Sequence, residues 1–449
     1  MAKAFEIWCD SSDLAIECEN VASSVGLLVE PHYAASPVEE AVASRAPERH
    51  IAFALTLAPE IEHLINLSKS HPISLLAILK SDRTSLTLRD LARDLGLVAV
   101  DEIRPLIAAV GLRVVGAEKP WSGSIRHVHP AQRIRLQPYI VGNQEKLRYQ
   151  SAQSSFVVAE RERRSSCLGE ARDVAIAIDA FYQSHAGRTH RRPGRPQVEG
   201  VNLEVVADVL FGPERALSDP ASKQALSAYD LPFPNEELCT SPSRAAAEAT
   251  RIGFPVRIAL ASPDLRIWDH PELAADGVDN AARVRDVYRQ ITALAKARTP
   301  GARILGVTVS ATSPAHALLW LKARALNTGE VHMSLGFSDP HGIATEDRLE
   351  TVLPASVEQL ECTLSRLQGN SLLSAERYRD QQDSISNIHD VLLRLTAFTQ
   401  DFDDKVRSVE VDPVALLVGG GIELREVCIE VGDAYERTIH GTVDIDSGD

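Results

Sequence analysis

The stretch Ile51-Ala-Phe-Ala-Leu-Thr-Leu57 is an apolar run of the length of one strand. A strand that is apolar on both faces is typical of a parallel sheet covered by helices on both sides. Outward from it, similar apolar runs alternate with amphipathic stretches. The runs are Phe5–Cys9, Gly26–Val29, Ile73–Leu79 and Leu97–Val100, and the amphipathic stretches are Asp13–Ser24, Pro37–Ser44, Pro59–Ser70 and Leu86–Leu95. The alternation predicts five strands with helical crossovers over residues 1–116.

Five such units make a flavodoxin-like α/β domain, in which functional sites lie at the carboxyl ends of the strands. Four segments are expected there, namely Asp10–Ser12, Glu30–His32, Ala58–Glu60 and Lys80–Asp82. None of them is a glycine-rich phosphate loop. A loop histidine such as His32 would be accessible there as an acid–base group or a phosphoryl carrier. A plain surface turn before the helix that starts at Pro37 is the preferred interpretation.

Charge and composition exclude several classes of function. The chain has 449 residues and a formal net charge of −15 at pH 7, which disfavours nucleic acid as a partner. No apolar stretch approaches the roughly 20 residues that span a bilayer, and the first residues lack the pattern of a secretory signal. The six cysteines lie far apart, without zinc-finger spacing, which argues against a disulfide framework or a structural zinc site. We therefore expect a cytoplasmic protein that binds neither nucleic acid nor membranes.

Residues 117–205 are predicted to be a linker region with one helix at Arg172–Ser184. Within it, Arg161–Arg195 carries eight arginines against four acidic residues and ends in a segment rich in glycine and proline. Such a stretch is typical of a solvated, flexible linker, and a strip that docks phosphate or protein is the alternative. A domain boundary is expected here.

Strands and helices are mixed over residues 206–440, which predicts an α+β domain of two lobes. Helices are expected at Asp219–Ala228, Arg244–Ile252, Ala281–Ala295, Ser356–Gln368 and Ile385–Thr399, and strands at Phe254–Ala259, Ala302–Val309, Ala315–Ala325, Val331–Leu335, Val406–Val411 and Leu424–Val431. The triplet Gly419–Gly421 lies between two predicted strands. It predicts a hairpin turn, because a phosphate loop would open a helix.

Five segments of this second half carry motifs in a fixed order. They are Leu217–Pro234 (LSDPASKQALSAYDLPFP), Ala245–Val256 (AAAEATRIGFPV), Ser262–Asp264 (SPD), Pro300–Val307 (PGARILGV) and Glu410–Pro413 (EVDP). In this order they resemble the ATP-grasp module of NDP-forming acyl-CoA synthetases (acetyl-CoA synthetase, ADP-forming, and its relatives). The first half more faintly resembles the flavodoxin-like CoA-ligase domain of that family, through Ile51–Leu57, Pro72-Ile73 and Leu91–Ile107. The family's glycine-rich CoA-binding Rossmann domain is not visible.

The resemblance implies a site for MgATP between the two lobes, where a strand lysine, hinge residues and metal-binding acids position the phosphates. Ala259 takes the lysine position and cannot neutralise a phosphate. Arg257, two residues earlier on the same face, is the candidate substitute, although a solvent-facing arginine is the simpler interpretation. Asp264 is the second nucleotide-binding candidate. Glu410 and Asp412 are candidate Mg²⁺ ligands, with Asp412 in place of an asparagine, and two solvated acids at a strand end are an equal alternative.

Three further segments depart from the family. Leu265–Val278 lacks a basic pair and a glycine, Ala315–Leu321 lacks an acid, and the turn near Ser334–Asp339 keeps one glycine. Glycine lost from a loop that approaches phosphate removes backbone freedom and close access. Departures at four separate points, all affecting one ligand, indicate a catalytically degenerate member.

The preferred hypothesis is a pseudoenzyme that acts as an accessory, assembly or ligand-sensing subunit, with a protein partner or a second copy of itself. No cofactor is certain; MgATP, CoA or a CoA ester would bind if a site is retained. The alternative is an active ATP-dependent acyl-CoA ligase that uses Arg257, Glu410 and Asp412. Its phosphohistidine would come from His32, His316, His332 or His341. A signalling receiver is disfavoured, since Ala54–Glu60 offers no aspartate at the end of the third strand.

Overall fold

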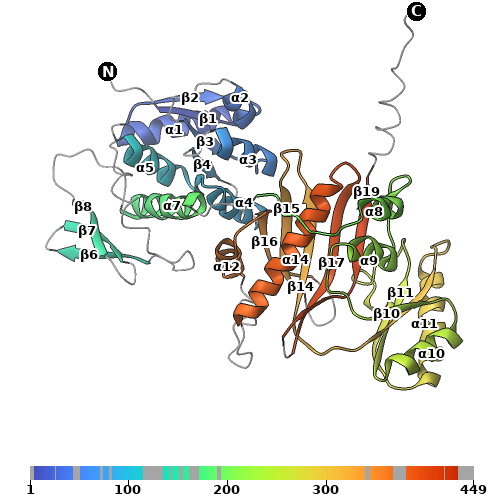
Figure 1. The fold of residues 1–449 in the computed structure, drawn as a ribbon. Coiled ribbons are helices and arrows are strands. Elements are labelled where there is room, and N and C mark those ends of the chain that lie inside the picture. Colours follow the sequence, from blue (N-terminus) through green and yellow to red (C-terminus); the bar gives the residue numbers. More distant parts are fainter. Residues whose placement is uncertain are drawn as a thin grey trace, which may run out of the picture. The chain divides into compact units, whose positions relative to one another are not determined.

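A computed structural model describes most of the chain, which divides into two compact units, Met1–Arg192 and Pro193–Asp449 (Figure 1). The described residues are 5–25, 27–43, 51–70, 74–79, 83–114, 135–141, 144–150, 155–160, 171–189, 194–338, 344–367, 381–418 and 420–432. Each unit is treated by itself below.

The first unit contains a five-stranded parallel sheet in the order β2-β1-β3-β4-β5. Its strands are β1 Phe5–Cys9, β2 Val29–Tyr33, β3 Ile51–Leu55, β4 Leu75–Ile78 and β5 Val98–Val100, and the helices between and after them are α1 Ser12–Ser24, α2 Pro37–Ala43, α3 Ile61–Ser70, α4 Arg83–Asp94 and α5 Ile103–Val114. The central strand β3 is buried along its whole length. This is the strand order of flavodoxin-like sheets, so the predicted fold class of the first half is confirmed.

The position of β2 corrects one prediction. The strand was expected at Gly26–Val29 but spans Val29–Tyr33, so Glu30–His32 lies within it and is no surface turn. β2 is an edge strand, where Pro31 can be accommodated because one side of the strand needs no ladder partner. The predicted loop Lys80–Asp82 lies outside the described residues.

Asp10 joins the carboxyl ends of β1 and β3. Its Oδ2 accepts hydrogen bonds from the backbone N–H groups of Thr56 at 2.7 Å and Leu57 at 2.9 Å, and from the Thr56 hydroxyl at 3.0 Å. A carboxylate that accepts three hydrogen bonds satisfies backbone donors that the end of β3 would otherwise leave open.

Helix α7, Ala171–Thr189, lies in the arginine-rich stretch that was predicted to be a flexible linker. It packs against α4, α5 and β5, with Val174, Ala177, Ile178 and Phe181 buried. The helix predicted at Arg172–Ser184 is therefore present, but the expectation of a flexible linker is wrong over this helix. A Cβ on Gly187 would lie 2.3 Å from the Arg93 carbonyl oxygen, so only glycine lets the helix approach α4 this closely. The unit also holds an unpredicted antiparallel sheet of β6 Arg135–Val141, β7 Gln144–Gln150 and β8 Ser155–Glu160.

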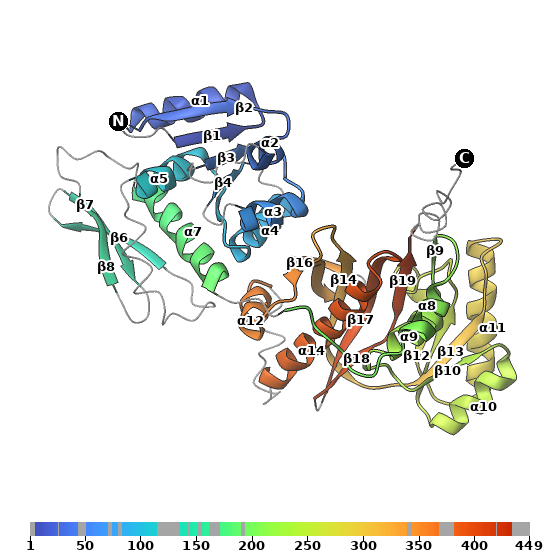
Figure 2. The same cartoon turned by 45° about the horizontal axis from the view of Figure 1, so that its top comes forward.

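The second unit has two lobes. The small lobe is a four-stranded antiparallel sheet in the order β10-β13-β11-β12. Its elements are β10 Glu236–Cys239, α10 Pro242–Ile252, β11 Val256–Ala261, η2 Pro271–Leu273, β12 Ala274–Val278, α11 Ala281–Arg298 and β13 Gly306–Ala311. Helices α10 and α11 pack side by side on it (Figure 2). The Asn280 side chain caps α11 by accepting from the Arg283 N–H at 2.9 Å, which explains where that helix begins.

The large lobe is a seven-stranded antiparallel sheet in the order β16-β15-β14-β17-β19-β9, with β18 paired to β17. Its elements are α8 Leu203–Leu210, β9 Arg215–Ala216, α9 Asp219–Ser227, β14 Ala315–Ala325, β15 Val331–Ser338, β16 Ala344–Leu353, α12 Val357–Leu364, α14 Gln381–Asp401, β17 Val406–Leu417, β18 Ile422–Leu424 and β19 Val427–Val431. Helix α14 runs across this sheet, and α8 and α9 cover the same face (Figure 1).

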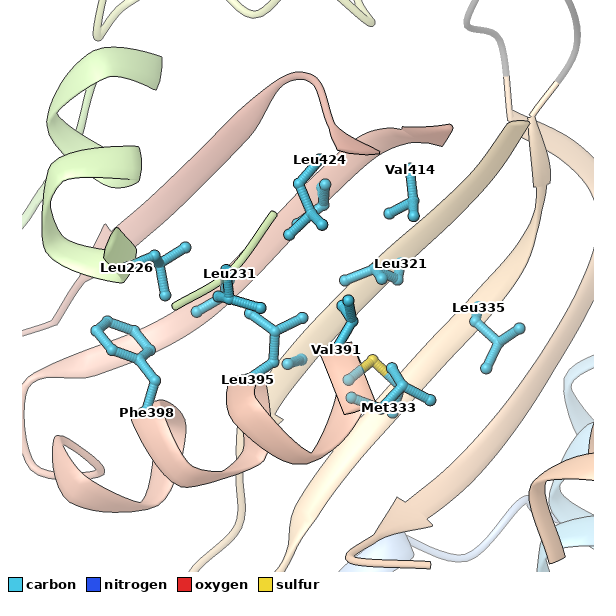
Figure 3. Close-up of a cluster of buried hydrophobic side chains, with 14 of the residues drawn as sticks. Leu226, Leu231, Leu321, Met333, Leu335, Val391, Leu395, Phe398, Val414 and Leu424 are labelled. Carbon is cyan, nitrogen blue, oxygen red and sulfur yellow. The ribbon is translucent and has the colours of Figure 1, made fainter. Parts of the chain in front are cut away.

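One continuous core fills the space between that face and its helices. Leu395 and Phe398 of α14 lie against Leu226 of α9 and Leu231, and alternate residues of β14 and β17 complete the cluster (Figure 3). Because side chains alternate along a strand, the opposite face of the sheet carries Trp320, Glu410 and other polar or charged residues. The core thus leaves that face available for a site.

Two details of the second unit bear on the sequence predictions. The turn expected near Ser334–Asp339 is wrong, because Ser334–Ser338 continues β15. The hairpin expected at Gly419–Gly421 is supported by the antiparallel pairing of β17 with β18, although Gly419 lies outside the described residues. No helix in the described part of the chain is long and apolar enough to cross a membrane.

Candidate functional site

A pocket lies between the two lobes, bounded by β10, β11, β12 and β13 on one side and by the segment around β18 on the other. It encloses about 340 Å³ of empty space that includes open solvent. Its charged lining residues are Glu236, Arg257, Asp276, Glu423, Arg425 and Glu426. Two arginines thus face four carboxylates, a balance of −2 when all six are ionised.

Arg257 of β11 is held between two carboxylates. Its Nη1 donates to both oxygens of Asp276 at 3.0 and 2.9 Å, and its Nη2 donates to Glu426 at 2.8 Å. Burial alone would lower the pKa of this guanidinium, but the two acids raise it, so Arg257 stays charged. The interpretation as a solvent-facing arginine is wrong, since its side chain is only 15% exposed. Ala259 is buried two residues further along the same strand.

Lys223 of α9 is the buried cation nearest to this arrangement in the chain's fold. Its Nζ donates to both oxygens of Glu236 at 2.8 Å and to the Arg425 carbonyl at 2.6 Å, and it lies 2.9 Å from Asp219. Burial would lower the pKa of Lys223, but the surrounding acids raise it. Burial raises the pKa of Asp219 well above its ordinary value, and it also raises that of Glu236.

Asp264 belongs to a turn. Its Oδ2 accepts from the Arg303 backbone N–H at 2.7 Å, its Oδ1 accepts from the Arg303 guanidinium at 3.1 Å, and its own N–H donates to Ser262 at 3.1 Å. The hydrogen bonds from Arg303 hold the pKa of Asp264 below its usual value. These contacts link the segment after β11 to the segment before β13, and a structural role accounts for all of them.

Glu410 and Asp412 lie on one face of β17 and are both hydrogen-bonded. Asp412 is 2% exposed, and its Oδ1 accepts from the Ser338 hydroxyl at 2.7 Å. Glu410 accepts from the Trp320 indole N–H at 3.0 Å and from the Lys322 ammonium at 3.3 Å. The alternative of two solvated acids at a strand end is therefore wrong. Oxygen ligands for a hard cation are present, and each already has a protein partner.

Of the four predicted site residues, the structure links Arg257 to Asp412, which shares a strand with Glu410, and leaves Asp264 apart. The Asp412 N–H donates to the Glu426 carbonyl at 3.1 Å, while the Glu426 side chain binds Arg257. Arg257 and Asp412 are therefore connected through Glu426, which was not predicted from the sequence as a site residue. Asp264 bonds instead to Arg303 in the small lobe.

Three ion pairs connect the lobes. They are Lys223–Glu236, Arg257–Glu426 and Arg266–Glu430. In the third, the guanidinium lies 2.5 Å from one carboxylate oxygen, and the Ser408 hydroxyl donates to the other oxygen at 3.0 Å. Burial would raise the pKa of Glu430, but these two donors lower it. Each pair thus joins an acid of one lobe to a cation of the other.

The four candidate histidines occupy different places. His32 lies on β2 of the first unit, and His316 and His332 lie on β14 and β15 of the second. The Nε2 of His332 is 2.6 Å from Glu350. His341 lies outside the described residues. No geometry on these elements selects one of them as a phosphoryl carrier.

Sequence analysis missed the carboxylates that neutralise the cations. Asp276 and Glu426 stand in segments where the family comparison offered no matching motif, so nothing in the sequence paired them with Arg257. Lys223 was also missed, although its i, i+4 spacing from Asp219 on a predicted helix is a signal that could have indicated an ion pair. Its burial and its link to Glu236 required the fold.

With this geometry described, comparison with known proteins defines the class. Residues 208–424 match the family model described as the ATP-grasp domain. These residues cover most of both lobes, so this part of the second unit is an ATP-grasp domain, and the predicted fold class of this half is confirmed.

The curated relatives that this region resembles are ADP-forming acyl-CoA synthetases. The beta subunit of ADP-forming acetate–CoA ligase II from Pyrococcus furiosus is 22% identical over 218 residues, which cover 48% of this chain and 92% of the relative. ADP-forming 4-hydroxybutyrate–CoA ligase from Nitrosopumilus maritimus is 24% identical over 205 residues, 45% of this chain and 29% of the relative. A solved acetyl-CoA synthetase 1 of Candidatus Korarchaeum cryptofilum, in complex with coenzyme A and Ca-AMPCP, matches with 22% identity and a TM-score of 0.44 over 51% of this chain and 98% of that one. The ATP-grasp domain of this chain is thus homologous to that of ADP-forming acyl-CoA synthetases, as the sequence motifs predicted.

Proposed function

We propose that the protein is a catalytically degenerate homologue of the ADP-forming acyl-CoA synthetases, and that it acts as an accessory, assembly or ligand-sensing subunit. The observation that carries the proposal is the state of Arg257. It is the candidate substitute for the phosphate-binding lysine, and both of its terminal nitrogens are held by Asp276 and Glu426. Its positive charge is balanced by two carboxylates, so it offers little net attraction to a phosphate, although these contacts use only three of its five N–H donors.

Electrostatics support this proposal. Two charges at 4 Å attract by roughly 4 kcal/mol when the effective dielectric constant is about 20, so releasing Arg257 from the buried Glu426 is costly. The pair with Asp276, whose side chain is 61% exposed, is screened by solvent and contributes less. An entering polyphosphate would then meet two unpaired acids in a pocket that already carries a balance of −2. Only a cation brought with the ligand would offset this repulsion. The ATP-grasp fold is retained, but the positive charge of Arg257, which a bound phosphate would need, is neutralised by Asp276 and Glu426.

Calorimetric titration with MgATP, MgADP, CoA and acetyl-CoA, each separately, tests the proposal. We expect no nucleotide heat at concentrations up to the millimolar range, since the pocket lacks free positive charge. Binding of CoA or acetyl-CoA without nucleotide binding would identify a ligand-sensing role, and no heat at all would favour an assembly role. Micromolar binding of MgATP or MgADP would contradict the degenerate site.

Restoring lysine at position 259 gives a matched test. Ala259→Lys is expected to raise MgATP affinity by less than about threefold, because Asp276 and Glu426 also attract the new ammonium. Ala259→Met introduces similar length without charge and controls for the volume added at this buried position. Titration of both variants is the measurement. A tenfold or larger gain for lysine over methionine would show that the remainder of the site is intact.

The second candidate is an active ATP-dependent acyl-CoA ligase with a rearranged site. It is favoured by the placement of Glu410 and Asp412 on one strand face, with Asp412 bonded through its backbone to the residue that holds Arg257. Release of ADP that depends on both CoA and a carboxylic acid would establish this candidate. The same assay with Asp412→Asn, which restores the asparagine of the family, would separate a metal role from a structural one.

A further inference from the structure

A second group of functional side chains lies in the first unit, far along the chain from the ATP-grasp domain. β1 and β2 are parallel neighbours, with Glu6 opposite Glu30 and Trp8 opposite His32. Side chains two residues apart on a strand share a face, so these four side chains lie on one face of the sheet at its β2 edge. None of them has a role in the function proposed above.

Three of the side chains are spaced as metal ligands. One ligand atom each from Glu6, Glu30 and His32 lies within 4.8 Å of the other two. Two atoms bound to one zinc ion at about 2.0–2.2 Å can be no more than about 4.4 Å apart, so small side-chain rotations are enough to close the group. Glu30 is exposed and free to make that adjustment, while Glu6 is only 7% exposed and fixed by its surroundings.

The environment of His32 supplies an independent observation. Its Nε2 atom is shielded from solvent and has no hydrogen-bond partner within the described part of the chain. A buried polar atom without a partner costs free energy, so such an atom in a native protein needs an explanation. The ring stacks on Trp8, with centroids 4.9 Å apart and planes 26° apart, which fixes its orientation. A fixed imidazole beside two carboxylates is a pre-oriented ligand set.

We propose that Glu6, Glu30 and His32 bind a divalent transition-metal ion of the zinc type. Two carboxylate oxygens and one imidazole nitrogen form a mixed ligand set that suits zinc, whereas Mg²⁺ and Ca²⁺ prefer oxygen alone. The ion neutralises two neighbouring carboxylates, one of which is buried, and gives the shielded imidazole nitrogen a partner. Three protein ligands leave the fourth tetrahedral position for water or for an outside ligand.

The full-length, metal-free protein titrated with ZnCl₂ tests the proposal, with a chromophoric chelator as competitor and Trp8 emission as a second readout. We expect one zinc ion per chain at this site and a change in fluorescence that is lost in Trp8→Phe. Glu30→Gln and His32→Gln each remove one ligand and are expected to weaken binding at least about tenfold, since even supporting partners of metal ligands are worth 10–100-fold. MgCl₂ is expected to bind far more weakly.

His63→Gln is the matched control. His63 also lies beside a glutamate, Glu39, at 2.8 Å in the same unit, but outside the three-residue group. It is expected to leave zinc affinity unchanged. Wild-type affinity in Glu30→Gln and His32→Gln, loss of binding in His63→Gln, or equal affinity for magnesium would each overturn the assignment. Because the ATP-grasp domain takes no part in these measurements, their outcome is independent of the function proposed for it.

Discussion

Lys223→Met is expected to destabilise the ATP-grasp domain by about 3–5 kcal/mol, because removing one partner of a buried ion pair leaves the other charge uncompensated. Lys223 is 6% exposed and lies among Asp219, Glu236 and Glu426, so methionine would keep its aliphatic packing but leave Asp219 and Glu236 without their cation. Amide hydrogen exchange of β17, followed by mass spectrometry, measures the loss within this unit alone.

The destabilisation is expected to depend on pH in a defined direction. Burial already raises the pKa values of Asp219 and Glu236, and loss of Lys223 raises them further. A carboxyl group whose folded pKa exceeds its unfolded value of about 4 reduces stability as pH rises through that interval. The deficit of the variant relative to wild type should therefore shrink as the pH is lowered toward the unfolded pKa of about 4.

Arg251→Met is the matched control for charge removal. Arg251 pairs with Glu248 on α10, and its side chain is 59% exposed. Exposed pairs contribute little, so protection of β17 should not change. Equal protection in Lys223→Met and Arg251→Met would contradict the buried ion network.

Phe398→Ala is expected to destabilise the large lobe by about 3–5 kcal/mol, since it removes a ring from a fully buried position. Phe398 contacts Tyr229 edge-on, with centroids 5.3 Å apart, and lies 5.6 Å from the Phe402 ring. The cavity would open between α14 and α9, where Figure 3 shows Phe398 beside Leu226 and Leu395. The aromatic contacts would be lost as well.

Exchange of the large-lobe amides again provides the measurement. Phe398→Leu keeps part of the volume and is expected to lose less stability than the alanine variant. Leu203→Ala changes a leucine on α8 that is 48% exposed, and it should alter stability by less than about 0.5 kcal/mol. A Phe398→Ala loss as small as that of Leu203→Ala would mean that the core rearranges to fill the space.

The fold was predictable from the sequence in segments where the spacing of apolar residues clearly fits either a strand or a helix. Ile51–Leu55 is apolar on both faces and could only be a central strand, and Ala281–Arg298 carries both a helical period and the capping residue Asn280. β2 was misplaced because Pro31 argues against a strand unless the strand is known to be at the edge. β10 and β12 were missed because Glu236 and Asp276 make short strands look like loops; these strands form only by pairing with β13 and β11.

The candidate site was less predictable than the fold. The substitution at Ala259 and the proximity of Arg257 follow from alternation along one strand. The partners of Arg257 do not, because Asp276 lies on a neighbouring strand and Glu426 is 169 residues away along the chain. Residues far apart in the chain come into contact only when the two sheets pack together. A single sequence does not indicate which acid will pair with which arginine.

The ion pairs between the lobes also have a kinetic consequence. Any separation of the two lobes would have to break the ion pairs Arg257–Glu426 and Lys223–Glu236. Both pairs are largely buried, so added salt, which screens charges over about 8 Å at physiological ionic strength, should hardly accelerate that separation. Arg266–Glu430 is about one-third exposed and is the pair that salt can reach. We therefore expect the rate of lobe opening to depend little on the salt concentration. It should depend more on any bound molecule that supplies a replacement cation for Glu426 or Glu236.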